Sequence, residues 1–226
     1  MHLLLTSPTG YIGSRTIHAA LHHPSISHIT ILSRRPLAPN TLAPNPRHIP
    51  IAVVVNEDFT TYPADIKEKL KGVDAAVWCL GNLDSGEDVH WGMTMAGLRA
   101  VEEAVGGREG RDRVRFVYVS GALAVRDQGA GLWFMGEGRR MRGRVETKLL
   151  EVGGEGKGVE CFVARPAFVM AEKRVWDPLM GGYSIPVAWL GAALVDVAVS
   201  GKEGERILEN GELRDRGSRV VETVLQ

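Results

Sequence analysis

The chain of 226 residues has little cysteine, no excess of charge of either sign and no long hydrophobic run. Its two cysteines, Cys79 and Cys161, lie in apolar segments, which excludes a disulfide framework and favours a reducing compartment such as the cytoplasm. Lys and Arg total 27, as do Asp and Glu, so we expect no nucleic-acid or membrane partner. The longest apolar run, residues 185–199, contains Pro186 and Asp196 and is too short to span a bilayer. Together with the length, these absences predict a soluble protein of one domain.

Short apolar segments alternate with segments of helical periodicity along most of the chain. The apolar segments, which we expect to be buried strands, are His2–Thr6, His28–Ser33, Ile49–Val55, Val73–Leu80, Val114–Ser120 and Val159–Ala164. The expected helices are Tyr11–His22, Ala64–Lys71, Trp91–Val105, Gly136–Val152 and Val187–Val199. Strands that are apolar throughout are typical of a parallel sheet covered by helices on both faces. The alternation therefore predicts a single α/β domain built on a doubly wound, mostly parallel sheet.

The first predicted strand runs directly into a turn that contains glycine and then into a helix. The turn is Thr6-Ser7-Pro8-Thr9-Gly10-Tyr11-Ile12-Gly13. Gly10 permits close approach of the backbone to a pyrophosphate, Gly13 permits close packing of helix on strand, and the helix N-terminus supplies N–H donors. Ser7-Pro8 stands where such turns carry their first glycine, which stiffens the turn. We interpret the segment as a dinucleotide-binding turn; a purely structural strand-to-helix turn is the alternative.

The second predicted strand ends in Ser33-Arg34-Arg35. A fold that binds NAD places Asp or Glu near this point to hold the ribose 2′-hydroxyl. A hydroxyl and two guanidiniums instead favour a 2′-phosphate, through charge-assisted and bidentate hydrogen bonds. The motif therefore predicts NADP(H) as the cofactor. A solvated basic turn is the alternative, because short charged motifs are weakly specific.

Further motifs follow these two turns along the chain. They are Asp58-Phe59, Val73–Gly81 ending in Leu80-Gly81, Phe116–Gly121 containing Ser120, Gly143-Arg144-Val145-Glu146, and Ala164-Arg165-Pro166-Ala167. In this order they resemble the motifs of the atypical short-chain dehydrogenase/reductases, in particular the NmrA-like and Tat-interacting-protein-like branch. The resemblance covers most of the chain, and it implies an NADP(H)-binding oxidoreductase with a Rossmann fold.

The resemblance also implies which residues contact the cofactor. They are Thr6, Ser7, Gly10, Tyr11, Ile12, Gly13, Ser33, Arg34, Arg35, Asp58, Phe59, Leu80, Gly81, Ser120, Arg142, Pro166 and Ala167. Ser120 stands at the carboxyl end of the fifth strand, where such folds bind substrates, and we expect it to hold a substrate oxygen rather than to act as a nucleophile. Residues 1–164 would then form the cofactor-binding core, and residues 165–226 a small cover on the substrate side.

The chain departs from the family at the catalytic pair. The family pattern Tyr-x-x-x-Lys stands immediately before Gly-x-x-Glu, which places Gly138 and Arg142 at the Tyr and Lys positions. In the family the Tyr donates a proton to the carbonyl, while the Lys lowers the pKa of that Tyr and binds the nicotinamide ribose. Arg142 can keep the ribose contact but not a proton shuttle, and it can pair with Glu146 one turn later. Tyr183 could reach the pocket from the cover, although a loop tyrosine is more often simply exposed.

Other candidates have a structural alternative beside the functional one. His90 is the best-placed general acid or base among seven histidines, although an exposed histidine at a helix start is the commoner situation. Residues 133–135, Trp-Phe-Met, suit the lining of an apolar substrate pocket or, equally, a core anchor for the following helix. His18 and His22 have the spacing of a metal pair, but no carboxylate or cysteine joins them, and we expect no metal.

Three functions are compatible with these residues. The first is an NADPH-dependent reductase of a small, largely apolar carbonyl or enone, with Ser120, Arg142 and His90 as the catalytic candidates and a substitute proton donor. The second is a cyclase or isomerase that uses the cofactor as a structural floor of its pocket. The third is a binding module in which the redox state of the cofactor alters contact with a protein partner. The substrate and the oligomeric state, a homodimer included, stay open.

Overall fold

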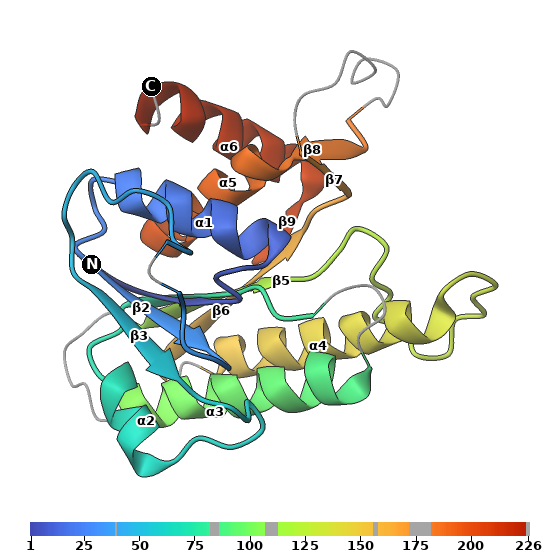
Figure 1. Ribbon diagram of the computed structural model, residues 1–226. Helices are drawn as coiled ribbons and strands as arrows, with labels where there is room; N and C mark the ends of the chain where they lie inside the picture. Colours follow the sequence, from blue (N-terminus) through green and yellow to red (C-terminus); the bar gives the residue numbers. More distant parts are fainter. Residues whose placement is uncertain (39, 82–85, 107–112, 156–157, 172–181, 225–226) are drawn as a thin grey trace.

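A parallel sheet of seven strands forms the centre of the protein, with helices on both of its faces (Figure 1). The computed structural model describes residues 1–38, 40–81, 86–106, 113–155, 158–171 and 182–224. The strands follow the order β3-β2-β1-β4-β5-β6-β9, and each neighbouring pair is parallel. The predicted doubly wound α/β sheet, the Rossmann arrangement, is confirmed.

The elements keep most of the expected boundaries. The strands of the sheet are β1 His2–Thr6, β2 His28–Ser33, β3 Ile51–Val55, β4 Ala75–Trp78, β5 Val114–Val119, β6 Val159–Arg165 and β9 Ile207–Glu209. The helices are α1 Tyr11–His22, α2 Ala64–Leu70, α3 Thr94–Val105, α4 Gly136–Gly154, α5 Val187–Ser200 and α6 Asn210–Val224. A π-helical turn, η1 Asp88–Met93, precedes α3, and two short strands, β7 Phe168–Met170 and β8 Ser184–Pro186, pair apart from the main sheet. The helix predicted from Trp91 therefore begins in a wider turn, and its α-helical part starts at Thr94.

The apolar runs of the strands are explained by two core layers, one on each face of the sheet. Successive side chains of a strand point to opposite faces, so Leu3 and Leu5 pack in the layer of α1 and α5, while Leu4 packs in the layer of α2, α3 and α4. All three leucines are at most 1% exposed. Burial of each such side chain contributes about 1.5–3 kcal/mol, which requires apolar residues on both faces of the strand.

Helices α1, α5 and α6 lie side by side over one face of the sheet, and glycines bring them close together (Figure 1). A Cβ at Gly191 of α5 would lie 2.7 Å from the carbonyl carbon of Arg15 in α1, and one at Gly217 of α6 would lie 2.1 Å from the carbonyl oxygen of Trp189 in α5. Within the described ranges no helix is long and apolar enough to cross a membrane. The apolar helix α5 instead packs against α1, α6 and the sheet.

The carboxyl ends of the strands meet at one edge of the sheet, and this edge positions the site. From β1 the chain proceeds to β2 and β3 on one side, then returns so that β4, β5 and β6 continue on the other side. In doubly wound folds ligands bind in the crevice where the strand order reverses. Here the strand order reverses between β1 and β4, so the segments that follow these strands are the candidate site.

Candidate functional site

The turn between β1 and α1 is tight, and two of its residues determine its shape. Ser7 has φ +55°, the left-handed conformation that glycine adopts without strain. A Cβ at Gly13 would lie only 2.0 Å from the Ser7 carbonyl oxygen, so the helix packs directly on the turn. The buried Thr6 hydroxyl accepts the Cys79 backbone N–H at 2.9 Å and thereby joins the ends of β1 and β4. Ser7, which stands at the first glycine position of the motif, thus adopts a conformation that favours glycine.

The first turn of α1 offers free backbone donors to an anion. Among the described residues no side chain caps this helix at Gly10, whose own N–H donates to the Ser7 carbonyl at 3.0 Å. The first N–H groups of a helix have no partner within it, so those of Tyr11, Ile12 and Gly13 face outward from the end of β1. Together with the helix dipole, they form the kind of anion site that binds a pyrophosphate.

The turn after β2 carries two exposed cations. The Ser33 carbonyl accepts the Asn56 N–H at 2.9 Å, and the Ser33 hydroxyl accepts the Arg35 N–H at 3.4 Å, which fixes the backbone here. The side chains of Arg34 and Arg35 are exposed, and neither guanidinium contacts a hydrogen-bond acceptor or a carboxylate among the described residues. Both guanidiniums are therefore free to bind an anion such as a ribose 2′-phosphate.

Asp58 and Phe59 differ in their surroundings. The exposed Asp58 carboxylate accepts hydrogen bonds from the Thr60 hydroxyl and N–H at 2.7 and 2.8 Å, and these bonds hold the pKa of Asp58 below its usual range. Phe59 is 1% exposed and stacks with Tyr62 in the core, with ring centroids 6.3 Å apart. Asp58 therefore stays ionised at the surface, while the side chain of Phe59 packs in the core.

His90 lies behind the end of β4, which corrects the expectation of an exposed side chain at a helix start. It belongs to η1 and is 3% exposed. Gly81, with φ +94°, lies directly against its ring: a Cβ there would be 2.6 Å from the His90 Cε1 atom. Strand β4 ends at Trp78, so Leu80 lies after the strand and not within it as predicted, and the histidine packs against Gly81.

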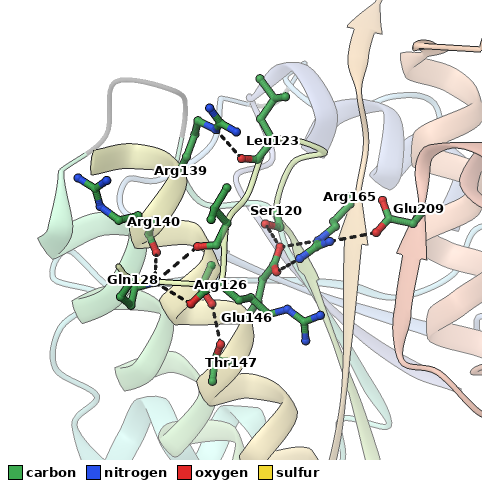
Figure 2. Close-up of polar contacts among 12 residues, drawn as sticks. Ser120, Leu123, Arg126, Gln128, Arg139, Arg140, Glu146, Thr147, Arg165 and Glu209 are labelled. Carbon is green, nitrogen blue, oxygen red and sulfur yellow. Dashed lines mark hydrogen bonds and ion pairs between the residues drawn. The ribbon is translucent and has the colours of Figure 1, made fainter. Parts of the chain in front are cut away.

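A chain of ionic and hydrogen-bonded groups links the ends of β5, β6 and β9 to α4 (Figure 2). The Ser120 hydroxyl donates to the Glu146 Oε1 atom at 2.6 Å. Arg165 contacts both oxygens of Glu146, with its Nε atom 3.0 Å from Oε1, and its Nη1 atom donates to Glu209 at 3.0 Å. Glu146 is fully buried, and its bonds raise the pKa of Arg165 further. The predicted pair of Glu146 with Arg142 is therefore wrong, because Glu146 faces the sheet.

Arg142 reaches the end of β5 from α4. Its Nη1 atom is 3.3 Å from the position that a Cβ at Gly121 would occupy, directly after Ser120. The side chain is half-buried, yet none of its N–H groups has an acceptor among the described residues. Arg142 is therefore a cation near the predicted active-site serine with its donors still available. Tyr118 is fully buried in β5, where burial raises its pKa, so its phenol is not an accessible proton donor.

The loop before α4 exposes its aromatic residues. Trp133 is 96% exposed, Phe134 49% and Met135 37%, so these residues are not a core anchor for the helix. The loop is held instead by polar contacts to α4: the Arg139 Nε atom donates to the Leu123 carbonyl at 2.8 Å, and the side chain of Gln128 donates to the Arg140 carbonyl at 3.0 Å (Figure 2). Polar contacts between the loop and α4, made by side chains of both, thus position the loop.

The remaining candidates occupy the edges of the site. The Pro166 carbonyl accepts the Ala122 N–H, and the Ala167 N–H donates to the side chain of Asn210, each at 2.9 Å. Tyr183 is 76% exposed. His18 and His22 are ring neighbours at 4.6 Å, and no group of three potential metal ligands gathers among the described residues. Sequence reasoning missed the burial of Glu146 and its pairing with Arg165, although both residues belong to motifs that it identified.

Comparisons with known proteins agree with this geometry at the level of the fold. No family model matches the chain. Over 81 residues it is 36% identical to leucinostatins biosynthesis cluster protein T of Purpureocillium lilacinum, a stretch that covers 36% of this chain and 28% of that protein. The chain therefore matches less than a third of the length of this relative.

Solved structures resemble the whole chain. The oxidoreductase ylbE of Lactococcus lactis matches with a TM-score of 0.69 at 13% identity, over 99% of this chain and 98% of that one. A short chain dehydrogenase of Burkholderia cenocepacia, in complex with NADP, matches with a TM-score of 0.66 at 13% identity. The match covers 98% of this chain and 92% of that one. A short-chain type dehydrogenase/reductase of Mycobacterium ulcerans matches with a TM-score of 0.65 at 16% identity, over 94% and 89%. The structural likeness to short-chain dehydrogenase/reductases is thus confirmed for the fold.

Proposed function

We propose that this protein binds NADP(H) across the carboxyl ends of β1 and β4 and uses it to reduce a small, largely apolar carbonyl or enone. One combination of features carries the proposal: the uncapped N-terminus of α1 and the guanidiniums of Arg34 and Arg35, which have no partner in the described part of the chain, lie after neighbouring strands. The first suits a pyrophosphate and the second a 2′-phosphate. A dinucleotide with both groups fits these two anion sites better than any single phosphate does.

The remaining cofactor contacts follow from the order of the strands. The residues that would hold the cofactor are those after β1, β2 and β3 for its adenosine half, and Leu80, Gly81, Ser120, Arg142, Pro166 and Ala167 for its nicotinamide half. When bound, NADPH would supply a hydride to the carbonyl carbon of a ketone or aldehyde, or to the β-carbon of an enone. The substrate then lies near Ser120 and Arg142, at the end of β5.

Arg142 has a defined part in this chemistry. Its free N–H groups can donate to the carbonyl oxygen as negative charge develops there, which lowers the barrier electrostatically. A guanidinium stays protonated at neutral pH, so the proton that completes the alcohol comes from water. General acid catalysis usually contributes about 10²–10⁴-fold, so we expect slow turnover rather than none.

The test is NADPH consumption with a panel of apolar ketones, aldehydes and enones. The proposal expects one alcohol or saturated ketone formed per NADPH consumed. Replacing Gly138→Tyr together with Arg142→Lys should raise that rate about 10–100-fold, because it supplies the missing acid and the group that lowers its pKa. Gly138→Tyr alone is the matched control. NADPH binding without consumption in the wild-type protein and the double variant would contradict the reductase proposal.

A non-redox enzyme is the second candidate. It is favoured by the absence of a tyrosine at Gly138 and by the hydrogen bond that the Ser120 hydroxyl donates to Glu146. Such a cyclase or isomerase would need the cofactor only as part of the pocket. Turnover of a substrate with NADPH present but not consumed would distinguish it from the reductase.

A further inference from the structure

We propose that Ser120 accepts a hydrogen bond from the substrate, while Arg142 binds the carbonyl oxygen, so that the preferred substrate is an α-hydroxycarbonyl compound. The inference rests on the proposed function for the position of the substrate and narrows its class. The sequence predicts only that Ser120 holds a substrate oxygen, and the hydrogen bond to Glu146 specifies the direction.

The contacts of Glu146 determine whether it carries a proton. Each of its oxygens accepts an N–H of Arg165: Oε1 from the Nε atom at 3.0 Å and Oε2 from the Nη2 atom. A proton on either oxygen would face a guanidinium N–H, and the Arg165 guanidinium would lose the counter-charge of the fully buried Glu146. Glu146 is therefore a carboxylate, which can accept hydrogen bonds and has none to donate.

The Ser120 hydroxyl therefore uses its only proton in the hydrogen bond to Glu146. Ser120 lies 2.6 Å from the Glu146 Oε1 atom, and its single proton must occupy that contact. The rest of the oxygen surface carries only lone pairs. A substrate carbonyl placed against Ser120 would set lone pair against lone pair, whereas a hydroxyl or N–H of the substrate would find an acceptor.

Arg142 supplies the complementary donor. Its Nη1 atom lies beside Gly121, the neighbour of Ser120, and its N–H groups have no acceptor among the described residues. An acceptor for a substrate hydroxyl and a donor for a substrate carbonyl are thus adjacent at the end of β5. An α-hydroxy ketone carries its two oxygens on neighbouring carbons, with one donor and one acceptor, and so matches this pair.

The experiment compares α-hydroxyacetophenone with α-methoxyacetophenone. The two compounds share the carbonyl, the aromatic ring and the second oxygen, but only the first has an O–H to donate. Two readouts are used: kcat/KM for NADPH consumption, and the Kd for each ketone in the presence of NADP⁺ by ligand-observed NMR. We expect the hydroxy compound to be preferred about tenfold in both, the value of one hydrogen bond to a well-placed acceptor.

Ser120→Ala tests whether this residue causes the preference. In this variant kcat/KM and Kd should become about equal for the hydroxy and methoxy compounds, because the acceptor is lost. Glu146 keeps its contacts with Arg165. Ser218→Ala, a serine on α6 whose hydroxyl donates to the Asp215 carbonyl, is the matched control and should retain the ratio.

The outcomes separate this inference from the proposed function. A tenfold preference in binding without NADPH consumption supports the inference and contradicts the reductase. Consumption of NADPH with equal use of both ketones supports the reductase and overturns the inference. A Ser120→Ala variant that weakens both ketones equally also overturns it, since that is the behaviour of a donor to the shared carbonyl, and so does binding of neither compound.

Discussion

At the scale of single residues, the ion pair of Glu146 with Arg165 holds the end of β5 between α4 and β6. Glu146 is fully buried, and the side chain of Arg165 is 14% exposed. A buried pair adds little stability relative to an apolar pair, but removal of one partner leaves a charge without compensation. The site thus depends on both members, and Arg165 extends the contact to Glu209 on β9.

Glu146→Ala should therefore lower the free energy of unfolding by about 3–5 kcal/mol, because the mostly covered Arg165 guanidinium would lose its main partner. Urea unfolding followed by circular dichroism measures this loss. Glu209→Ala is the matched control: its carboxylate also binds Arg165 but is 60% exposed, so we expect a loss of at most about 1 kcal/mol. Equal losses in the two variants would show that burial of Glu146 is not what matters.

His23 links stability to pH. Burial lowers its pKa, and its Nδ1 atom accepts the Ser25 N–H at 3.2 Å, which requires the unprotonated ring. Between the lowered folded value and the ordinary value of about 6.5, the unfolded chain binds more protons than the folded chain. The contribution of His23 is therefore fully present above about pH 6.5 and is lost as the pH falls below it.

His23→Asn should reduce the loss of stability between pH 7.5 and pH 5.5, since asparagine cannot take up a proton. Chemical unfolding at the two pH values measures the difference. His48→Asn is the control, because His48 is exposed and its φ of +52° suits asparagine. If both variants lose as much free energy of unfolding between pH 7.5 and pH 5.5 as the wild-type protein, other groups govern the pH dependence.

Single residues were predicted well where a motif fixes their place along a strand and poorly where a fold buries them. Ser120 directly follows β5, and Arg142 reaches Gly121 beside it, as their positions in the motifs indicate. Glu146 was assigned to Arg142 by helical spacing, which describes neighbours on an exposed helix surface but not a side chain that faces the sheet. His90 was expected at the surface because periodicity does not foresee a π-helical turn.

At the scale of elements, the turn between β1 and α1 depends on direct backbone contact. Gly13 leaves no room for a side chain, since a Cβ would lie 2.0 Å from the Ser7 carbonyl oxygen. That neighbour is backbone and cannot swing aside as a flexible side chain could. The helix can approach the turn, and offer its N–H groups above β1, only with glycine here.

Gly13→Ala should therefore destabilise the protein by about 1–3 kcal/mol and weaken cofactor binding as well. Thermal unfolding with and without NADPH measures both effects. Gly211→Ala is the matched control in α6, because a Cβ there meets nothing within 4 Å, and it should be neutral or stabilising by up to about 1 kcal/mol. An unchanged melting temperature for Gly13→Ala would mean that α1 can move away from the turn.

The basic turn after β2 should select between the two nicotinamide cofactors. Arg34→Ala with Arg35→Ala should weaken NADPH binding about 10–100-fold and NADH binding little, because only NADPH has the 2′-phosphate. Titrations followed by nicotinamide fluorescence give the two Kd values. The matched control is Arg219→Ala, an exposed arginine on α6. Equal weakening of both cofactors by the double variant would exclude a 2′-phosphate site.

Elements were predictable where they are long and periodic. The bounds of α1 and β2 agree with the structure, since both are bounded by turns and bury apolar residues in regular order. Strands β7 and β8 have three residues each, too few for a periodic pattern. Helix α6 is polar over most of its length and contains Gly211 and Gly217, so that its packing against α5 is a tertiary effect.

At the scale of the whole molecule, the alternation of apolar strands with helices is sufficient to predict the sheet, because buried parallel strands and right-handed crossovers leave few other arrangements. The last strand, β9, joins beside β6 and brings Glu209 to Arg165. That contact joins residues distant in sequence, so local patterns do not reveal it. The fold explains where a cofactor would bind; the chemistry depends on the few side chains at the ends of β4, β5 and β6.

The most direct test of the central claim is a titration of the purified protein with NADPH and, in parallel, with NADH. Nicotinamide fluorescence would report binding, and the melting temperature would report its effect on stability. Two anion sites, at the N-terminus of α1 and at Arg34 and Arg35, predict that NADPH binds at least tenfold more tightly than NADH and raises the melting temperature more. Binding of neither cofactor, or equal binding of both, would contradict the account.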